Sequence, residues 1–314
     1  MTTPLVSVIM PAYNASRFMG EAVQSILDQT FSDLELIIVD DASTDSTLQI
    51  CEKLSQGDGR IRIHQRTSNG GIAAALNDAL QMCRGRFIAR MDADDISLPD
   101  RLRSQLQRFD ELPRIALCGT AIEIVDEHGT LLSRPGTIVG CGQVAAALRY
   151  CSPIAHPSWM MRAEVAREIE GYRSVAPAED YDFLWRVIRQ GWAVDNVPVV
   201  GLRYRMSSGS TAARNSLRQR KAFNFVRRMH LNGQELDLQA FKKAIECGNI
   251  ARSLHQSSEG LLQRASRLHA SRNPLAYVLI ALAAAMSPHQ LQFVWRAART
   301  RQILRRSRNA GIAP

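Results

Sequence analysis

Short apolar runs alternate with amphipathic segments over the first hundred residues. Residues 17–29 carry their apolar side chains on one stripe with helical spacing, and residues 34–39 are mostly apolar, as buried strands are. The predicted elements are, in order, strand 6–10, helix 17–29, strand 34–39, helix 44–54, strand 60–65, helix 72–82 and strand 87–91. Strands separated by helices imply right-handed crossovers, so the pattern predicts an α/β fold with a mainly parallel sheet flanked by helices.

The pattern is mixed from about residue 100 to 205 and helical after it. The predicted elements are helices 100–112, 143–149, 162–170 and 180–190, strand 116–125 and an edge strand 203–206. From residue 215 onward the expected helices break near Gly233, Gly248, Pro274 and Pro288. We therefore expect a first domain over residues 1–212 and a helical C-terminal region over residues 213–314.

The net charge of +9 is confined to the C-terminal region. Residues 260–314 contain nine Arg and no Asp, Glu or Lys, so the rest holds 39 − 9 = 30 basic residues against 30 acidic ones. A basic tail seeks an anionic surface, either lipid headgroups or nucleic acid. Because the tail has no ordered aromatic platform, we expect no nucleic acid. Trp and Phe among the arginines of 288–314 suit contact with an anionic membrane surface, and a solvated helix that caps the domain is an equal alternative.

Two further features bear on location. The apolar stretch 275–286 is about a dozen residues long, whereas a spanning helix needs about 20. The six cysteines form no CxxC pair, and the N-terminus does not resemble a signal peptide. We expect a cytoplasmic protein, and the basic tail suggests a peripheral position on the inner face of the cytoplasmic membrane.

Polar and aromatic side chains follow three of the predicted strands. Tyr13 follows the first strand, Asp41 the second, and Asp92 and Asp94 the strand that ends at Met91. Open α/β sheets bind ligands at the carboxyl ends of their strands. There Tyr13 can stack on a nucleobase and Asp41 can accept a hydrogen bond from a base or ribose.

The two aspartates predict a cation site. In an extended backbone Asp92 and Asp94 point to the same side and can hold one Mg²⁺ or Mn²⁺, which usually also binds a substrate phosphate. The alternatives are a tyrosine that only packs, a helix cap at Asp41, Ser43 or Thr44, and a solvated acidic turn.

Six motifs in this order resemble the signatures of family 2 glycosyltransferases. They lie at residues 8–14, 38–45, 69–71, 91–95, 155–157 and 178–186. The resemblance covers about residues 5–210 and is closest to the bacterial branch that builds polysaccharides and O-antigens. It implies the GT-A fold, a Rossmann-like sheet, and a nucleotide-diphospho-sugar donor, most often a UDP-sugar. The implied acceptor is a saccharide or lipid-linked hydroxyl in cell-surface polysaccharide assembly.

The resemblance also implies roles. Asp41 would bind the base on which Tyr13 stacks, and Asp94, helped by Asp92, would hold the metal on the diphosphate. Asp180 would be the general base of a single inverting displacement. A catalytically silent nucleotide-binding or scaffold module is the alternative, although intact acidic motifs argue against it.

Other residues are weaker candidates. The donor-binding set also includes Pro11 and Asn14 of the first motif, and Asn69 and Gly70, where a glycine lets the backbone approach the donor. His156 could contact the metal or the diphosphate, and Arg205 could close over the diphosphate. Each has a structural alternative: a buried histidine beside proline, a solvated edge strand for Arg205, and a helix N-cap for Asp180.

Overall fold

The computed structural model describes residues 3–206, 216–270, 273 and 275–309. Its strands are β1 (Val6–Ala12), β2 (Leu34–Asp40), β3 (Ile61–Gln65), β4 (Phe87–Arg90), β5 (Ile96–Ser97), β6 (Ile115–Val125), β7 (Leu131–Ser133), β8 (Met160–Arg162) and β9 (Ala193–Arg205). The helices of the first part are α1 (Met19–Leu27), α2 (Thr47–Gly57), α3 (Ile72–Met82), α4 (Arg101–Glu111), α5 (Cys141–Leu148), the 3₁₀ turn η1 (His156–Ser158), α6 (Ala163–Glu168) and α7 (Glu179–Arg189). The C-terminal helices are α9 (Ser216–Leu231), α10 (Leu238–Ile245), α11 (Asn249–Ala270), α12 (Leu275–Met286) and α13 (Pro288–Asn309).

Within the described residues the strands form one mixed sheet. Its order is β3-β2-β1-β4-β8-β6-β9-β5, and β7 pairs with β6 beside this path. Strands β1 to β4 pair in parallel, as helical crossovers require, and β8 is antiparallel to both β4 and β6. The parallel half therefore has all its carboxyl ends at one edge of the sheet.

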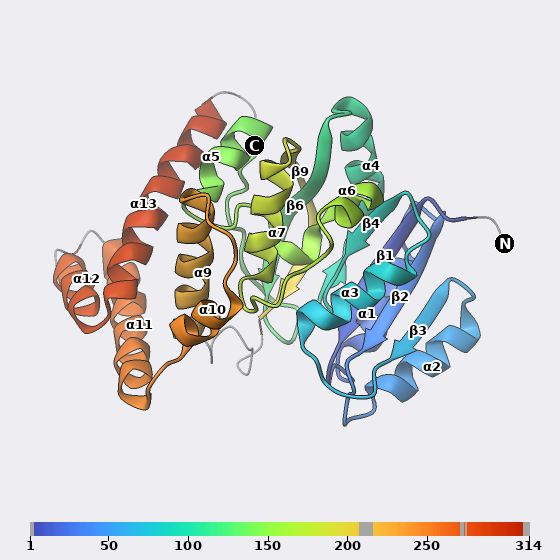
Figure 1. Ribbon diagram of the computed structural model, residues 1–314, viewed down its shortest axis with the longest axis horizontal. Helices are drawn as coiled ribbons and strands as arrows, with labels where there is room; N and C mark the ends of the chain where they lie inside the picture. The colour runs from blue at the N-terminus through green and yellow to red at the C-terminus, as the bar shows by residue number, and fades with distance from the viewer. Residues whose placement is uncertain (1–2, 207–215, 271–272, 274, 310–314) are drawn as a thin grey trace.

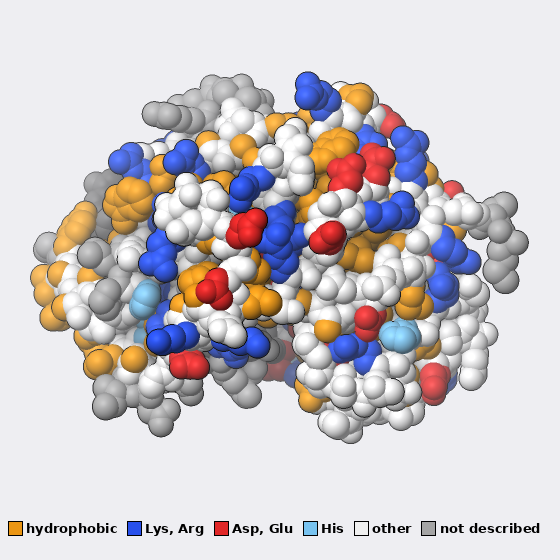
Figure 2. Space-filling view, viewed as in Figure 1, with side chains coloured by type: hydrophobic (Ala, Val, Ile, Leu, Met, Phe, Trp, Pro, Cys, Tyr) orange, Lys and Arg blue, Asp and Glu red, His pale blue; other side chains and the backbone are white. Residues whose placement is uncertain are grey.

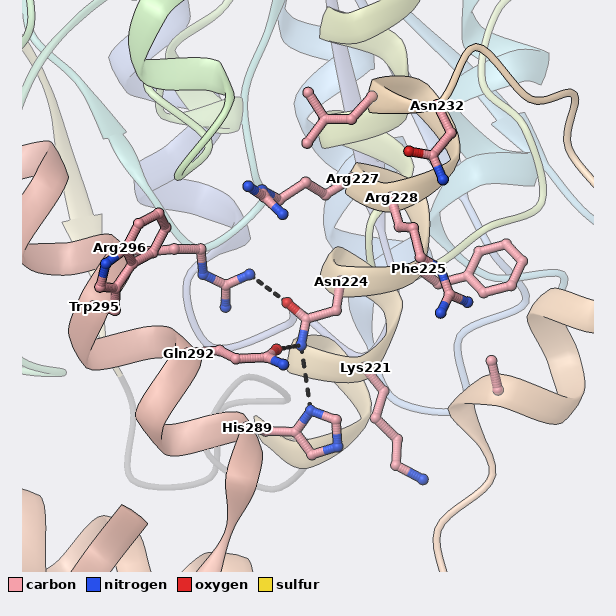
Figure 3. A pocket seen from close by; sticks show the side chains of 12 residues that line it. Lys221, Asn224, Phe225, Arg227, Arg228, Asn232, His289, Gln292, Trp295 and Arg296 are labelled. Atoms are coloured by element: carbon pink, nitrogen blue, oxygen red, sulfur yellow. Dashed lines mark hydrogen bonds between the residues drawn. The ribbon is translucent and has the colours of Figure 1, made fainter. Parts of the chain in front are cut away.

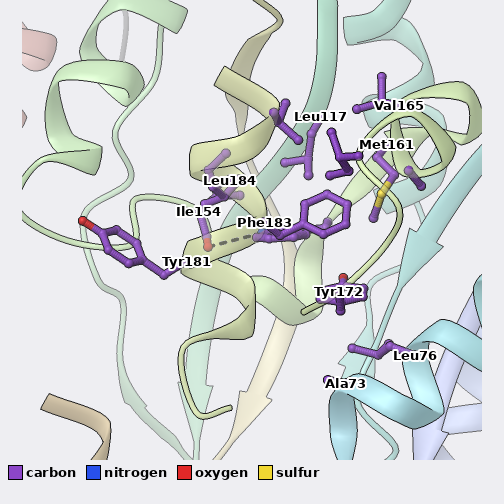
Figure 4. Close-up of a cluster of buried hydrophobic side chains, with 14 of the residues drawn as sticks. Ala73, Leu76, Leu117, Ile154, Met161, Val165, Tyr172, Tyr181, Phe183 and Leu184 are labelled. Carbon is purple, nitrogen blue, oxygen red and sulfur yellow. Dashed lines mark hydrogen bonds between the residues drawn. The ribbon is translucent and has the colours of Figure 1, made fainter. Parts of the chain in front are cut away.

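Alternate residues of the central strands serve two hydrophobic cores. In β1, Ile9 faces one core, whereas Val8 and Met10 face the other. Helices α1, α2 and α4 cover the second core, and α3, α5, α6, α7 and α9 cover the first. In the first core Phe183 of α7 lies among apolar side chains of β6, β8 and α6 (Figure 4). This packing fixes the position of α7, whose first turn lies near the end of β4.

The C-terminal helices form a layer on the side away from β1–β3 (Figure 1). Helix α9 packs against α7, and α13 packs against α5 and α9. Tyr181 of α7 stacks on Phe223 of α9 with ring centroids 4.0 Å apart. None of the described helices is both long enough and apolar enough to cross a membrane.

Most predicted elements are confirmed, with three corrections. The helix predicted over 72–82 is α3, and the breaks near Gly233 and Gly248 separate α9, α10 and α11. The predicted break at Pro274 and the predicted domain boundary after residue 212 lie outside the described residues. Asp41, Ser43 and Thr44 are the alternative caps predicted for the second helix, but α2 begins at Thr47 and Ser46 occupies its N-cap.

The other two corrections concern strands. The edge strand expected over 203–206 is the end of the long strand β9, which lies between β6 and β5 and is not an edge. The helix predicted over 162–170 is confirmed as α6, and the short strand β8 that precedes it was not predicted.

Candidate active site

A tight turn after β4 brings three carboxylates together. The backbone N–H of Asp95 donates to the carbonyl oxygen of Asp92 at 3.3 Å, so the segment is a turn and not the extended strand end predicted from the sequence. Carboxylate oxygens of Asp92, Asp94 and Asp95 lie within 4.8 Å of one another. The expectation that Asp92 and Asp94 share one site agrees with this geometry, although the turn, and not strand alternation, produces it.

Two arginines hold this turn from either side. Arg90, at the end of β4, is 1% exposed, and its guanidinium donates to both carboxylate oxygens of Asp92, at 2.9 Å to Oδ2. Arg205 donates from its backbone N–H to Asp95 Oδ1 and from Nε to the Asp94 carbonyl, both at 2.8 Å. The Arg205 guanidinium also pairs with Glu21 at 2.6 Å. Arg205, predicted to close over a diphosphate, therefore supports the backbone of the acidic turn in this structure.

Helix α7 brings a second acidic pair toward the turn. Glu179 is buried and Asp180 is partly buried in the first turn of the helix, and Ala178 occupies the N-cap, so Asp180 is not the cap residue. Burial and the charge of Asp180 raise the pKa of Glu179 to about 7. Burial also raises the pKa of Asp180, opposed by hydrogen bonds and by the charge of Arg90. Both groups thus lie within electrostatic reach of the arginine that binds Asp92.

The negative charge around Arg90 exceeds the positive charge. The carboxyl groups concerned are those of Asp92, Asp94, Asp95, Glu179 and Asp180. Burial and the charge of Asp92 raise the pKa of Asp94 to about 6 and also raise the pKa of Asp95. Within the described residues, Asp95 Oδ2 and Glu179 Oε2 are buried without a hydrogen-bond partner. A set of oxygen ligands with excess charge and unpaired buried oxygens fits Mg²⁺ or Mn²⁺, and Asp94 with Asp92 would hold the ion.

His156 lies beside this region but outside the carboxylate group. Its Nε2 is 2.9 Å from the hydroxyl of Tyr172, and its ring packs edge-on against Trp159 at 4.5 Å. Burial and the charge of Arg90 lower the pKa of His156 well below its usual range, so the imidazole is neutral at physiological pH. The metal-binding role predicted for His156 stays a prediction, and the structure shows it ordering Tyr172.

Asp41 joins two loops at the carboxyl edge of the parallel strands. Its carboxylate accepts the backbone N–H of Gly70 at 2.9 Å and that of Gly71 at 2.8 Å, and it pairs with Arg66. Asn69 donates from its side chain to the Asp41 carbonyl at 3.2 Å. A side chain at Gly70 would place its Cβ 2.2 Å from the Arg66 guanidinium. The structure thus brings Asp41, Asn69 and Gly70 together, as predicted, and adds Arg66.

The first motif forms the neighbouring loop. Pro11 lies within β1, and Tyr13, just after the strand, is 50% exposed. Asn14 has a positive φ of 50°, and its Oδ1 accepts the backbone N–H of Thr44 at 2.8 Å. Tyr13 is thus free to contact a ligand, whereas Asn14 ties this loop to the one after β2.

Three residues of the site were not predicted as functional. Glu179 sits beside the predicted base, Tyr172 contacts His156, and Arg66 binds Asp41. Glu179 could have been found from its place before Asp180 at the start of a strongly amphipathic helix. Arg66 and Tyr172 carry no local signal, because their partners are distant in the sequence.

The mixed sheet has the fold of known nucleotide-sugar-binding proteins. In solved structures the same fold occurs in the S. aureus protein TarS bound to UDP, with a TM-score of 0.60 and 17% identity over 93% of this chain and 91% of that chain. It also occurs in the mannosyltransferase PcManGT from Pyrobaculum calidifontis in complex with GDP-Man and Mn²⁺, with a TM-score of 0.59 and 17% identity over 98% of this chain and 87% of that one. These likenesses confirm the predicted GT-A-like fold.

Sequence comparison gives the family. The model of glycosyl transferase family 2 matches residues 7–168, and the chain belongs to this family and is a glycosyltransferase. It is similar to the putative glycosyltransferase EpsE of Bacillus subtilis, 37% identical over 60% of this chain and 68% of that protein. It is also similar to the O-antigen biosynthesis glycosyltransferase WbnJ of Escherichia coli, 31% identical over 66% of this chain and 82% of that protein. The family predicted from the motifs is therefore confirmed.

Proposed function

We propose that the protein is a metal-dependent, inverting glycosyltransferase that uses a nucleotide-diphospho-sugar in cell-surface polysaccharide biosynthesis. The observation that carries the proposal is the convergence of the acidic turn after β4 and the acidic start of α7 around the buried Arg90. The names of EpsE and WbnJ support a glycosyl transfer of this kind, and WbnJ acts in O-antigen biosynthesis. The UDP in TarS and the GDP-Man in PcManGT support a nucleotide-sugar donor, and we propose a UDP-sugar.

The donor would lie along the carboxyl edge of the parallel strands. We assign the exposed ring of Tyr13 to stacking on the nucleobase. The Asp41 carboxylate, which already accepts two N–H groups, has remaining lone pairs for a base N–H. Asp94 and Asp92 would hold Mn²⁺ or Mg²⁺, which when bound neutralises the charge of the departing nucleoside diphosphate.

The acceptor would approach from the start of α7. Asp180 has a raised pKa, which makes its carboxylate a stronger base toward an acceptor hydroxyl. Arg90 binds Asp92 and favours the charged form of Asp180, so the same cation orients the metal ligand and opposes protonation of the base. The hydroxyl oxygen, freed of its proton, attacks the anomeric carbon from the face opposite the leaving group, and that carbon is inverted.

We also propose that the acceptor is a saccharide or a lipid-linked saccharide at an anionic membrane surface. Apolar side chains of α12, among them Leu275, Val278 and Leu282, are at least half exposed, and Trp295 on the basic helix α13 is 49% exposed. Exposed apolar side chains beside arginines suit a peripheral contact with anionic lipids. Liposome sedimentation with and without residues 288–314 tests this part, and equal binding by both chains would contradict it.

The transfer itself is tested by release of nucleoside diphosphate from a panel of nucleotide-sugars with Mn²⁺, with water in place of the acceptor. We expect release from one donor, and we expect Asp180→Asn to lower its rate about 100- to 10,000-fold. Donor binding, measured by thermal shift with Mn²⁺, should be kept in the variant, because Asp180 contacts the acceptor and not the donor.

The matched control is Asp110→Asn, which removes an exposed carboxylate on α4 and should leave the rate unchanged. Donor binding without release in the parent protein would favour the silent nucleotide-binding module instead. A parent and an Asp180→Asn variant with the same rate would overturn the assignment of the base.

A further inference from the structure

A cavity lies in the C-terminal layer, lined by none of the residues of the acidic turn. It measures about 910 Å³ and is lined by residues of α9, α10 and α13. In Figure 3 the side chains of Arg227, from α9, and Arg296, from α13, extend toward one another across the space between the two helices. A cavity of this size accommodates a ligand of more than ten non-hydrogen atoms.

The charged side chains of this cavity are all cationic. Lys221, Arg227, Arg228 and Arg296 line it, and no described Asp or Glu does. No carboxylate of a described residue lies within 4.0 Å of any of the four. In Figure 2 Lys and Arg side chains are spread over both halves of the visible face, and several of them lie over the C-terminal layer. Repulsion between four cations without a counter-charge favours an anionic ligand.

Arg296 shows the imbalance most clearly. It is 6% exposed, its guanidinium stacks over the Phe223 ring at 4.6 Å, and it donates to the side-chain oxygen of Asn224. Burial and the charge of Arg227 lower the pKa of Arg296 to about 10. Three other buried arginines are paired, since Arg90 binds Asp92, Arg186 binds Asp182 and Arg205 binds Glu21. Arg101 is also buried without a carboxylate, but it donates to the backbone carbonyls of Arg90 and Trp159 and to the side chain of Gln105. A buried guanidinium without an acidic partner is costly unless a ligand supplies the anion.

The cavity also has apolar walls. Phe225 and Trp295 line it, and the Trp295 ring lies edge-on to Tyr150 at 5.7 Å. His289 lines the same cavity, and burial together with the charge of Lys221 lowers its pKa. The imidazole therefore adds a neutral polar group and no further charge. The cavity combines a cationic centre with aromatic surface, so it suits a ligand with both an anionic and an apolar part.

We propose that this cavity binds a phosphoryl anion, a phosphate or diphosphate, that carries an apolar chain. Two guanidinium groups that face each other match the oxygen geometry of phosphate, and four cations balance a multiply charged group better than a single carboxylate. The apolar chain would lie on Phe225 and Trp295. The inference does not depend on the proposed transfer reaction, because the cavity shares no residue with the acidic turn or with Asp180.

The test is isothermal titration calorimetry of the full chain in EDTA and chloride buffer. The probes are farnesyl diphosphate, inorganic pyrophosphate and farnesol, which separate the anion from the chain. We expect both diphosphates to bind and farnesol alone not to bind. Tighter binding of farnesyl diphosphate than of pyrophosphate would support a phosphoryl ligand with an apolar chain. Equal binding of the two would contradict the proposed role of the chain. Absence of binding by both diphosphates would overturn the proposal.

Substitutions of the arginines that line the cavity test whether the diphosphates bind there. Arg296→Gln should weaken diphosphate binding about tenfold, because one charge-assisted contact is lost. The matched control is Arg301→Gln on the exposed face of the same helix, which removes the same charge and should have no effect. Arg227→Gln serves as a second variant if Arg296→Gln fails to fold. Asp94→Asn should leave the binding unchanged, and equal weakening by Arg301→Gln and Arg296→Gln would contradict the assignment.

Discussion

The edge of the sheet and the C-terminal layer contain opposite kinds of unbalanced charge. Around Arg90 the carboxyl groups outnumber the buried cations Arg90, Arg101 and Arg205, and the pKa values of Asp94 and Glu179 are raised to about 6 and about 7. Between α9 and α13 several cations share a cavity without a carboxylate from a described residue, and the pKa of Arg296 falls to about 10. In both regions the shift moves each group toward its neutral form.

The sign of the buried charge indicates which ligand each region binds. Buried like charges destabilise a fold unless an ion of opposite sign binds to them and offsets the loss. The first region fits a divalent cation, and the second fits a phosphoryl anion. The two regions touch through α7 and α9, where Tyr181 stacks on Phe223, which in turn lies under Arg296.

The largest expected effect comes from removing a metal ligand. Asp94→Asn should lower Mn²⁺-dependent release of nucleoside diphosphate more than about 100-fold, because the ion loses a proposed carboxylate ligand. Burial and the charge of Asp92 already raise the pKa of this carboxyl group. A titration of the rate with Mn²⁺ checks this, with Asp110→Asn as the control of equal charge change. Full activity at ordinary Mn²⁺ concentrations would show that the acidic turn is not a cation site.

The parallel half of the fold was predictable because its signals are local. The apolar run of β1 and the stripe of α3 lie within single segments, so periodicity placed both elements. The acidic residues after the second strand and after the strand that ends at Met91 likewise predicted Asp41 and Asp94 at one edge, whereas Asp180 came only from the family resemblance. These features need no knowledge of distant partners.

The contacts of Ser43 and Arg205 were not predicted, because each residue is bound by a partner that is distant in the sequence. Ser43 resembles a helix cap, but its hydroxyl accepts the backbone N–H of Asn14 at 3.0 Å, and the helix starts later. Arg205 resembles a free cation near a strand end, but Glu21 and the Asp94 carbonyl engage it. Each competing hydrogen bond joins residues about 30 or more positions apart, and no local pattern reveals such a bond.

The contact between the two regions can be broken at a buried histidine. His230 of α9 lies with its Nε2 2.8 Å from Asp182 Oδ1 in α7, and both side chains are buried. His230→Leu should lower the free energy of unfolding by about 2 kcal/mol, since Asp182 Oδ1 loses its hydrogen-bond partner. Arg186 still binds Oδ2, and Arg173 lies 3.9 Å from Oδ1. Urea unfolding measures this, with the exposed His128→Leu as control. A loss no greater than the control's would mean that other contacts join the layers.

Glu179 gives a pH test of the acidic region. Its folded-state pKa of about 7 lies above the usual 4.5, so the stability it contributes is full below pH 4.5 and is lost as pH rises through about 7. Glu179→Gln should therefore stabilise the metal-free protein at pH 8 by on the order of 2 kcal/mol, and the gain should vanish near pH 4.5. Thermal unfolding in EDTA across this range tests the sign, with the exposed Glu52→Gln as control. A gain that does not depend on pH would contradict the charge imbalance.

The smallest expected effect is on stability and comes from replacing the buried cation Arg296, which has no carboxylate partner among the described residues. Arg296→Met replaces an unpaired buried cation by an apolar side chain of similar length, so in phosphate-free chloride buffer the free energy of unfolding should stay constant or rise by up to about 1 kcal/mol. A compensated arginine would behave differently, because its removal would strand a partner and cost several kcal/mol. Urea unfolding beside Arg301→Met distinguishes the two cases. If Arg296→Met were strongly destabilising without any ligand, the guanidinium would already be balanced within the fold, and the cavity would have no need of an anion.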